Sequence, residues 1–344
     1  DEFVFDLDFH PTRSLVAAGV ISGTIPIYQY SLDGCELVTK APNHKDSCRA
    51  VSFSQNGQYL FSASTDHSAA VFDLEANAVL YTMENAHGCP INSMLCFDNM
   101  MATGDDTGCV KVWDLRSRVC AYTFEECQDY ISCFRYVPVN HTLLCTSGDG
   151  TLTVFNTRKG KVVGASDSMD DELLSCEIIK GGKKVVCGSQ AGILNIFSWG
   201  QWGDISDRFP GHPQSIDAIV PLAESVIATG SSDGMIRAIQ IQPNKVLGVL
   251  GDHEFPVERL ALAKVGPYLG SCSHDNMLKF WNIANLLEED SDEEEEKAEE
   301  AEEQSEDKGE DGNGNDMDVE QAEEKKVTEN RPRGAGRKNF FADL

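Results

Sequence analysis

The stretch GDDTGCVKVWDLR, residues 104–116, joins a polar turn to a short apolar strand. Its Asp-Thr-Gly turn supplies the polar side chains and the backbone freedom that a tight turn requires. The valines at 110 and 112 alternate with other side chains, as in a strand with a buried face. The strand ends in the dipeptide Trp113-Asp114. One copy of this pattern predicts little, so the fold depends on whether the chain repeats it.

The chain repeats this turn at intervals of 41 to 44 residues. The turn positions equivalent to Gly108 are Gly23, His67, Gly150, Gly192, Gly234 and Asn276. Five residues after each turn position comes a large apolar residue: Tyr28, Phe72, Trp113, Phe155, Phe197, Ile239 and Trp281. A repeat of this length is typical of a β-propeller with four strands per blade. Seven copies predict an all-β, seven-bladed propeller over residues 1–287, and the chain resembles the WD-repeat family.

Four histidines recur at one position, shortly before a predicted strand: His44, His87, His212 and His253. They could be metal ligands or catalytic bases, but recurrence at one structural position favours a role in satisfying buried polar groups. The WD-repeat resemblance implies a buried hydrogen-bonded set of His, Ser or Thr, Asp and Trp within a blade. The last repeat matches that set with His253, Ser271 or Ser273, Asp275 and Trp281. The second repeat has Phe72 in place of the Trp, and the sixth has Ile239.

The net charge of −28 is unevenly distributed along the chain. Residues 288–330 contain 22 acidic and 4 basic side chains, and residues 331–344 carry a net +3. This leaves −13 for the predicted propeller, residues 1–287. A body of that sign repels nucleic-acid phosphates, which argues against DNA or RNA binding by the propeller itself.

The twelve cysteines form no CxxC pair and are spread over the predicted strands. The chain opens without a hydrophobic signal segment and has no apolar run of about 18 residues, so we expect no membrane association. Together these features predict reduced, mostly buried thiols in an intracellular protein. A zinc site would need clustered ligands, and the sequence shows none, so we expect no metal and no cofactor.

The fifth repeat contains two tryptophans in a glycine-rich loop, Trp199 and Trp202. Exposed tryptophans are typical of partner-binding surfaces. They could equally cover the side of a blade, and the sequence leaves both interpretations open.

The acidic segment, residues 288–330, contains almost no aromatic residues and is expected to be disordered, because it cannot bury enough apolar surface to offset the entropy of ordering. It could act only as a solubilising segment, or it could contact basic partners: ribosomal proteins, histones or the chain's own basic end. The last residues, 331–344, combine a basic cluster with a terminal apolar group: Arg331, Arg333, Arg337 and Lys338, then Phe340, Phe341 and Leu344. This composition predicts a targeting signal or RNA-backbone contact, followed by a docking peptide.

Residues 7–9 match the inner strand of the second repeat, whereas the last repeat shows only three strands, ending with residues 278–283. WD-repeat propellers usually take a missing outer strand from the N-terminus, which closes the ring and removes an open edge. The resemblance therefore predicts that residues 1–5, and chiefly residues 2–5, pair beside the last group of strands.

The segment Gly-Ser-Ser-Asp-Gly at residues 230–234 fits the G-x-S-x-G motif of hydrolases. That motif needs a strand-to-helix turn and acid and histidine partners, whereas this copy falls on a predicted strand-to-strand turn. The sequence shows no phosphate loop and no pair of catalytic carboxylates. We therefore expect a non-enzymatic binding platform.

Two further resemblances concern function. The stretches HGCPINSM (87–94), SGDGTLTVFN (147–156) and GSSDGMIRAI (230–239), with the acidic tail and the NFFADL end, resemble the WD repeat-containing protein 55 family. That resemblance implies a nuclear, chiefly nucleolar protein, also present in the cytoplasm, that serves ribosomal RNA production and ribosome assembly. Its expected partners are pre-ribosomal assembly factors or ribosomal proteins.

Residues 101–116 also resemble the WDxR box of substrate receptors of cullin-4 ubiquitin ligases, through Trp113, Asp114 and Arg116. In that family the arginine docks on the ligase's propeller adaptor. Two hypotheses follow: a nucleolar scaffold for ribosome assembly, and a ligase receptor. Co-purification of pre-ribosomal particles, or of cullin-4 with its adaptor, would distinguish them.

Overall fold

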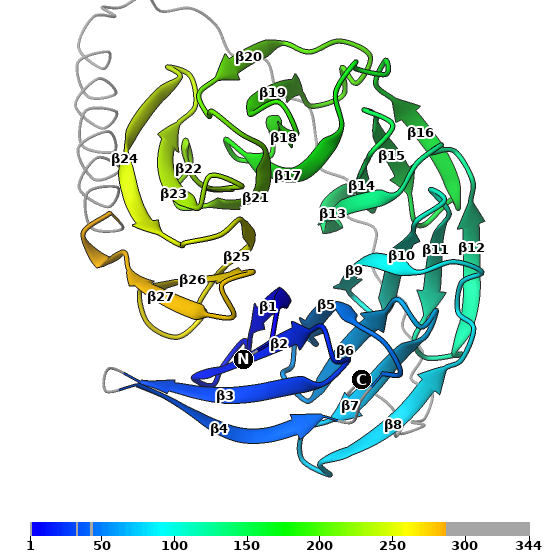
Figure 1. The fold of residues 1–344 in the computed structure, drawn as a ribbon. Helices are drawn as coiled ribbons and strands as arrows, with labels where there is room; N and C mark the ends of the chain where they lie inside the picture. Colours follow the sequence, from blue (N-terminus) through cyan, green and yellow to red (C-terminus); the bar gives the residue numbers. More distant parts are fainter. Residues whose placement is uncertain (1, 32–33, 42–43, 287–344) are drawn as a thin grey trace, which may run out of the picture. The chain divides into compact units, whose positions relative to one another are not determined.

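The computed structural model describes residues 2–31, 34–41 and 44–286. Seven antiparallel sheets surround a central axis, as Figure 1 shows, so the predicted seven-bladed propeller is confirmed. The chain divides into two units, Asp1–Leu287 and Glu288–Leu344, and the propeller is the first. The predictions for residues 288–330 and for the terminal cluster, Arg331 to Leu344, lie outside the described residues.

Each of the first six blades has four strands in chain order, from the innermost to the outermost, and the seventh has three. The strands are β1 (Val4–Phe9), β2 (Leu15–Val20), β3 (Ile25–Ser31), β4 (Gly34–Ala41); β5 (Cys48–Phe53), β6 (Tyr59–Ser64), β7 (Ala69–Asp73), β8 (Ala78–Met83); β9 (Ile91–Phe97), β10 (Met100–Asp105), β11 (Val110–Asp114), β12 (Val119–Phe124); β13 (Ile131–Val137), β14 (Thr142–Ser147), β15 (Leu152–Asn156), β16 (Lys161–Ala165); β17 (Leu173–Ile179), β18 (Lys184–Ser189), β19 (Ile193–Ser198), β20 (Asp207–Pro210); β21 (Ile216–Pro221), β22 (Val226–Ser231), β23 (Met235–Gln240), β24 (Lys245–Asp252); β25 (Val257–Leu262), β26 (Tyr268–Ser273) and β27 (Leu278–Asn282). In the part of the chain that is described, no helix is long and apolar enough to span a membrane.

The repeated turn position explains why glycine recurs along the sequence. All seven predicted turn residues have a positive φ, between 66° and 84°. At Gly108 a side chain would also collide with the next blade, because a Cβ atom there would lie 2.4 Å from the carbonyl oxygen of Cys127. His67 and Asn276 adopt the same left-handed conformation without being glycine, at φ 69° and 66°. Backbone geometry and close approach of the neighbouring loop thus set the period seen in the sequence.

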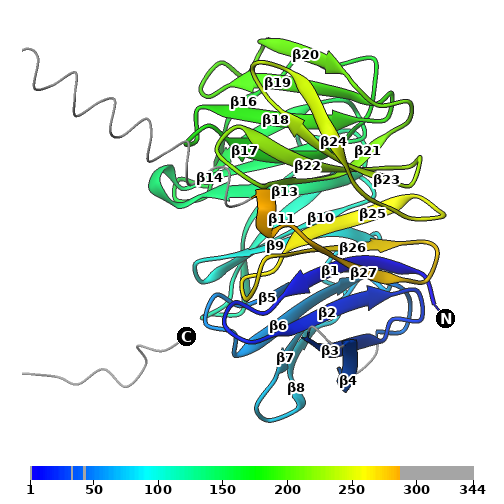
Figure 2. The same cartoon turned by 90° about the vertical axis from the view of Figure 1, so that its left-hand side faces the viewer.

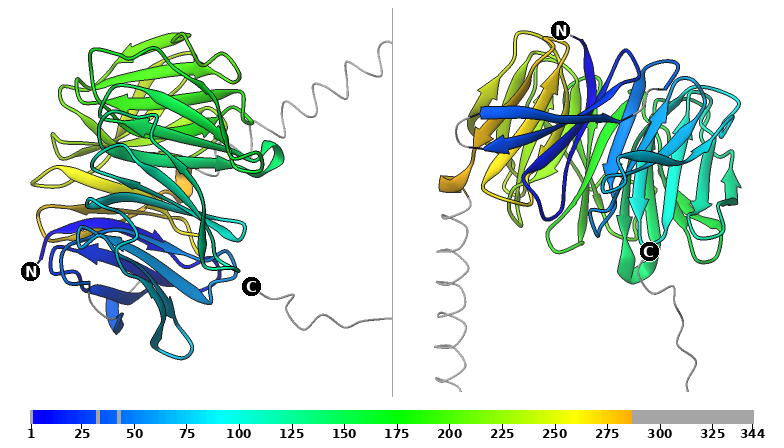
Figure 3. Two further views of the ribbon diagram at one scale, coloured as in Figure 1. Left: turned by 90° about the vertical axis from the view of Figure 1, so that its right-hand side faces the viewer. Right: turned by 90° about the horizontal axis from the view of Figure 1, so that it is seen from below.

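The hydrophobic core consists of seven clusters, each shared by two neighbouring blades. Between blades three and four, for example, Phe97 packs with Phe134 and Phe155. Figure 3 shows the blades from the side and from below, stacked face to face around the ring. Cysteines contribute to these clusters, in line with the prediction of buried thiols: Cys48, Cys127, Cys133, Cys145, Cys176, Cys187 and Cys272 are buried.

The predicted pairing of the N-terminal residues with the last blade is wrong. Residues 3–5 instead extend the inner edge of blade one: Val4 pairs with Val20, and the Phe3 carbonyl accepts a hydrogen bond of 3.0 Å from the Ile21 backbone N–H. The last sheet keeps three strands among the described residues. Figure 2 shows β1 running beside β26, and the ring closes here by side-chain packing, with Leu7 and Phe9 against Cys272.

Candidate functional site

The histidine of the last blade lies in a continuous chain of buried hydrogen bonds. Its Nδ1 is 2.7 Å from Asp275 Oδ2 and its Nε2 is 2.7 Å from Ser271 Oγ. Ser271 Oγ also accepts a hydrogen bond of 2.8 Å from Trp281 Nε1. Of the two serines left open by the sequence, Ser271 joins this chain, whereas Ser273 donates to the Phe255 carbonyl. Burial lowers the pKa of His253, so the neutral ring serves as a structural link between strands.

Blade three holds an equivalent set that the sequence analysis missed. His87 is hydrogen-bonded to Asp105 at 2.8 Å and to Thr103 at 2.7 Å, and Trp113 Nε1 donates to Thr103 at 2.8 Å. The carboxylate comes from the end of β10, three residues before Gly108, whereas Asp275 directly precedes Asn276. His87 at the repeated position and Trp113 were the available signals; the displaced aspartate concealed the match.

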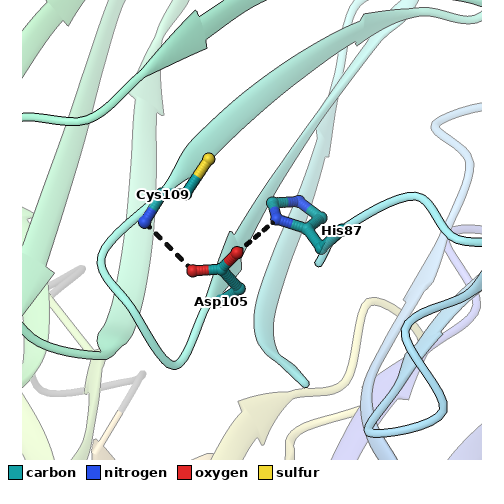
Figure 4. Close-up of side chains that lie close together, drawn as sticks. All are labelled: His87, Asp105 and Cys109. Atoms are coloured by element: carbon teal, nitrogen blue, oxygen red, sulfur yellow. Dashed lines mark hydrogen bonds and ion pairs between the residues drawn. The ribbon is translucent and has the colours of Figure 1, made fainter. Parts of the chain in front are cut away.

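This set also forms the group most similar to a metal site in the part of the structure that is described. The ligand atoms of His87, Asp105 and Cys109 lie within 4.8 Å of one another, and Figure 4 shows the Asp105 carboxylate between the other two. The carboxylate already accepts hydrogen bonds from the His87 ring, from Thr107 and from the Cys109 backbone N–H. Burial raises the pKa of the Cys109 thiol to about 11, so it is protonated near neutral pH. These atoms stabilise the turn, and nothing in the arrangement calls for an ion.

The other two histidines are held in incomplete sets. His44 bonds Ser68 at 2.9 Å and Ser62 at 2.8 Å. His212 Nε2 bonds Thr229, but its Nδ1 has no hydrogen-bond partner. The reason is that Asp233 turns toward Arg237, with 2.6 Å between Oδ2 and Nη2. Burial lowers the pKa of His212 to about 4, so the ring is neutral at physiological pH.

The G-x-S-x-G segment is a turn between the antiparallel strands β22 and β23, as its repeat position predicts. Ser232 Oγ donates to Asp217 Oδ2 at 2.8 Å and lies beside Ser215 Oγ. Among the hydrogen bonds of the described residues, none joins Ser232 to a histidine. The serine therefore lacks the geometry of an activated nucleophile.

The WDxR residues occupy the end of β11 and the turn that follows. The Asp114 carboxylate accepts hydrogen bonds from the backbone N–H groups of Arg116 and Ser117, at 2.9 and 3.4 Å, and these bonds lower its pKa. Trp113 instead points into the blade network. Arg116 is exposed to solvent, whereas Trp113 and Asp114 are partly buried, so the Arg116 side chain is the most accessible of the three to a partner.

The two tryptophans of blade five lie against each other, with ring centroids 5.0 Å apart at 75°. Both are partly buried against the cluster between blades four and five. A Cβ atom on Gly164 of β16 would lie 3.1 Å from Trp202 Cδ1. The rings therefore cover the flank of the neighbouring blade, and a partner-binding role for Trp199 and Trp202 stays a prediction.

The outer strands expose large apolar side chains. Among them are Leu37, Val38, Val79, Leu80, Val119, Val163, Val246, Leu247 and Val249. Each is at least 38% exposed, and they lie on the strands β4, β8, β12, β16 and β24. We call these residues the apolar rim. These side chains are spread over five blades, and single exposed apolar residues are normal on protein surfaces, so a role for the apolar rim in protein binding stays a proposal.

The inner strands enclose a cavity of about 330 Å³ at one end of the central channel. Every inner strand contributes its second residue to the lining: Phe5, Arg49, Asn92, Ser132, Leu174, Asp217 and Glu258. We call this cavity the channel mouth. The sequence analysis missed it because no residue type repeats at this position, so periodicity carries no signal there.

Comparison with known proteins agrees with the WD-repeat fold. The sequence profile of the WDR55 family matches residues 1–286. WD repeat-containing protein 55 of Arabidopsis thaliana is 44% identical over 288 residues, covering 83% of this chain and 81% of that protein. The Homo sapiens protein of the same name is 42% identical over 284 residues, covering 81% of this chain and 74% of the relative. The chain therefore belongs to the WDR55 family of WD-repeat propellers.

Proposed function

We propose that this protein is a non-catalytic scaffold of the nucleolus that holds partner proteins during ribosomal RNA production and ribosome assembly. The observation that supports the scaffold role is that the histidines, hydroxyls and carboxylates of the blade networks hydrogen-bond to one another and link strands. Side chains used in this way stabilise the fold and are not arranged for catalysis. WD-repeat propellers of this family are generally non-catalytic scaffolds, and the apolar rim supplies surface for protein contacts.

The nucleolar part of the proposal rests on the family resemblance and on charge. Residues 1–287 carry −13 and residues 288–330 carry −18, so both favour basic protein partners over nucleic acid. Ribosomal proteins are basic and need such partners before assembly. The basic residues after position 330 fit a nucleolar address.

The test is affinity purification of the tagged full-length chain from cells, followed by mass spectrometry. We expect ribosomal proteins and pre-ribosomal assembly factors to be enriched over a tag-only control. Their absence from the purified material, together with a diffuse distribution in the cell, would remove the nucleolar role and leave only the scaffold.

A second candidate, a substrate receptor of a cullin-4 ligase, is favoured by the exposure of Arg116 in a turn that Asp114 fixes. Arginine is enriched among the interface residues whose truncation costs about 2 kcal/mol or more. If the box operates, the ligase adaptor co-purifies with the wild-type chain. Lack of the adaptor in that material would exclude this candidate without affecting the first.

A further inference from the structure

The channel mouth has more acidic than basic groups once internal pairs are set aside. Asp6 and Arg259 form an ion pair, with 3.0 Å between Oδ1 and Nε, and so offset each other. This leaves the carboxylates of Asp217 and Glu258 facing one guanidinium, that of Arg49, which lies 3.9 Å from the centre of the Phe5 ring. The mouth therefore has a net negative charge and one aromatic-stacked cation.

Polar atoms without hydrogen-bond partners are concentrated at this place. The described residues contain five buried side-chain atoms without a hydrogen bond, and three of them belong to residues that line the mouth. Asp6 Oδ1 is already in the ion pair with Arg259, whereas Arg49 Nε and Ser93 Oγ have no hydrogen-bond partner. A fourth, His274 Nε2, lies 3.1 Å from Glu258 Oε1 without the geometry of a hydrogen bond. Ser93 is only 2% exposed, and Asp6 only 4%. Such groups are rare in folded proteins, and each calls for an explanation.

The two carboxylates are also poorly stabilised in their ionised form. Burial raises the pKa of Asp217, although the hydroxyls of Ser215 and Ser232 donate to it. Burial, together with the charge of Asp217, raises the pKa of Glu258 to about 7 against the lowering effect of Arg49. A second cation placed between these carboxylates would supply the counter-charge that they lack.

We propose that the channel mouth binds a lysine or arginine side chain presented by a partner protein. The side-chain ammonium or guanidinium group donates to the carboxylates of Asp217 and Glu258, which line the cavity. The inference rests on the proposed scaffold function, because it names the kind of partner segment that the scaffold holds.

An anionic ligand fits the same atoms less well. It would have only Arg49 as an unpaired cation and would lie beside two carboxylates. A neutral side chain such as glutamine could donate hydrogen bonds to the carboxylates but would leave their excess of one negative charge over Arg49 uncompensated. The charge balance at the mouth therefore selects a basic side chain.

The experiment measures binding of short capped peptides, Gly-Ala-X-Ala-Gly, to the purified full-length chain by calorimetry, with X as Lys, Arg, Gln or Glu. We expect the Lys or Arg peptide to bind at least about tenfold more tightly than the Gln and Glu peptides. The double variant Asp217→Asn/Glu258→Gln is expected to lose that preference. The matched double variant Glu36→Gln/Glu75→Gln removes the same charge at exposed positions and is expected to keep it.

Equal binding of all four peptides, or an unchanged preference in the Asp217→Asn/Glu258→Gln variant, would overturn the proposal. The melting temperature of the Asp217→Asn/Glu258→Gln variant shows whether it is folded. We do not expect the melting temperature to fall, because the neutral side chains remove buried charge, so a clear fall would indicate misfolding. The basic side chain could also come from the chain's own terminal cluster, which the full-length variant Arg331→Ala/Arg333→Ala/Arg337→Ala/Lys338→Ala removes. If this variant binds the Lys or Arg peptide as tightly as the wild type does, a partner protein supplies the basic side chain. If this variant binds the peptide more tightly than the wild type does, the chain's own basic residues compete for the channel mouth, and the proposal that a partner protein occupies it is wrong.

The outcome is independent of the cellular test of the proposed function. Selective peptide binding without recovery of ribosome-assembly proteins would contradict the nucleolar role and keep the site. Recovery of those proteins by both wild type and the mouth variant, without selective peptide binding, would contradict the site and keep the role.

Discussion

Glu258 makes the stability of the propeller depend on pH. Its side chain is partly buried, 29% exposed, where the seven inner strands meet. The groups that face it are Asp217, Arg49 and His274. A carboxyl whose pKa is higher in the folded than in the unfolded state destabilises the fold once it ionises. The penalty is absent below the unfolded pKa of about 4.5 and grows as pH rises through about 7. Carboxyl groups whose pKa is raised by burial are found more often at binding and catalytic sites than elsewhere.

Glu258→Gln should therefore stabilise the propeller, and only at higher pH. From the pKa shift we expect a gain of at most about 3 kcal/mol in the free energy of unfolding at pH 8, and a small difference near pH 5. Urea denaturation of both proteins at the two pH values measures this, with the exposed Glu254→Gln as control. A gain of equal size at both pH values would contradict the assignment.

Ser271 is a second residue with a disproportionate role, because its hydroxyl accepts from Trp281 and bonds His253. Ser271→Ala leaves two polar groups unpaired, and each costs about 1–3 kcal/mol when buried. We expect a loss of at least about 2 kcal/mol in the free energy of unfolding. Ser273→Ala removes a donated bond to the Phe255 carbonyl and a longer bond, of 3.3 Å, accepted from the Asp275 backbone N–H, and should cost about 1 kcal/mol. Equal losses in the two variants would mean that the chain of hydrogen bonds does not act as a unit.

At the scale of elements, strands and turns could be predicted from the sequence where one residue type recurs at the same position of each repeat, and sites without such recurrence could not. The turn at Gly108 and its six equivalents could be predicted because backbone strain and close packing impose one residue type. The blade-three network was missed because Asp105 supplies the carboxylate from a shifted position. The channel mouth could not be predicted, because Arg49, Asp217 and Glu258 come together only through the ring and follow no period. The closing strand was wrongly predicted because residues 3–5 complete blade one.

The outermost strand of the last blade, β27, has one unpaired edge among the described residues, which predicts faster amide hydrogen exchange in that strand. Strand β27 pairs only with β26 among the described residues, whereas β11 lies between β10 and β12. Amides on the unpaired edge lack backbone acceptors and should exchange faster. Hydrogen exchange followed by mass spectrometry should therefore show β27 less protected than β11. Equal protection of the two strands would indicate that another segment or a partner covers the edge of β27.

At the scale of the whole molecule, the described residues form seven similar interfaces between neighbouring blades, and these stabilise the propeller. Such an architecture behaves as a ring of nearest-neighbour contacts, in which the closing interface between blades seven and one completes the fold. Because the interfaces between blades hold the fold together, the residues of the apolar rim and the channel mouth can vary without loss of the propeller.

Deleting residues 288–344 should leave the melting temperature nearly unchanged, because a highly acidic segment of this composition has little apolar surface to bury. The same deletion removes the acidic segment and the basic cluster, so we expect weaker nucleolar retention of a fluorescent fusion. A fall of several degrees in the melting temperature would show that these residues contribute to the fold.

The central claim is that this scaffold supports ribosomal RNA production, and the most direct measurement is pulse labelling of ribosomal RNA after acute depletion of the protein. After depletion we expect less labelled mature ribosomal RNA. Labelled precursors should accumulate if processing fails and fall if synthesis fails, and re-expression of the wild-type chain should restore the normal pattern. Normal synthesis and processing of ribosomal RNA in cells that lack the protein would contradict it.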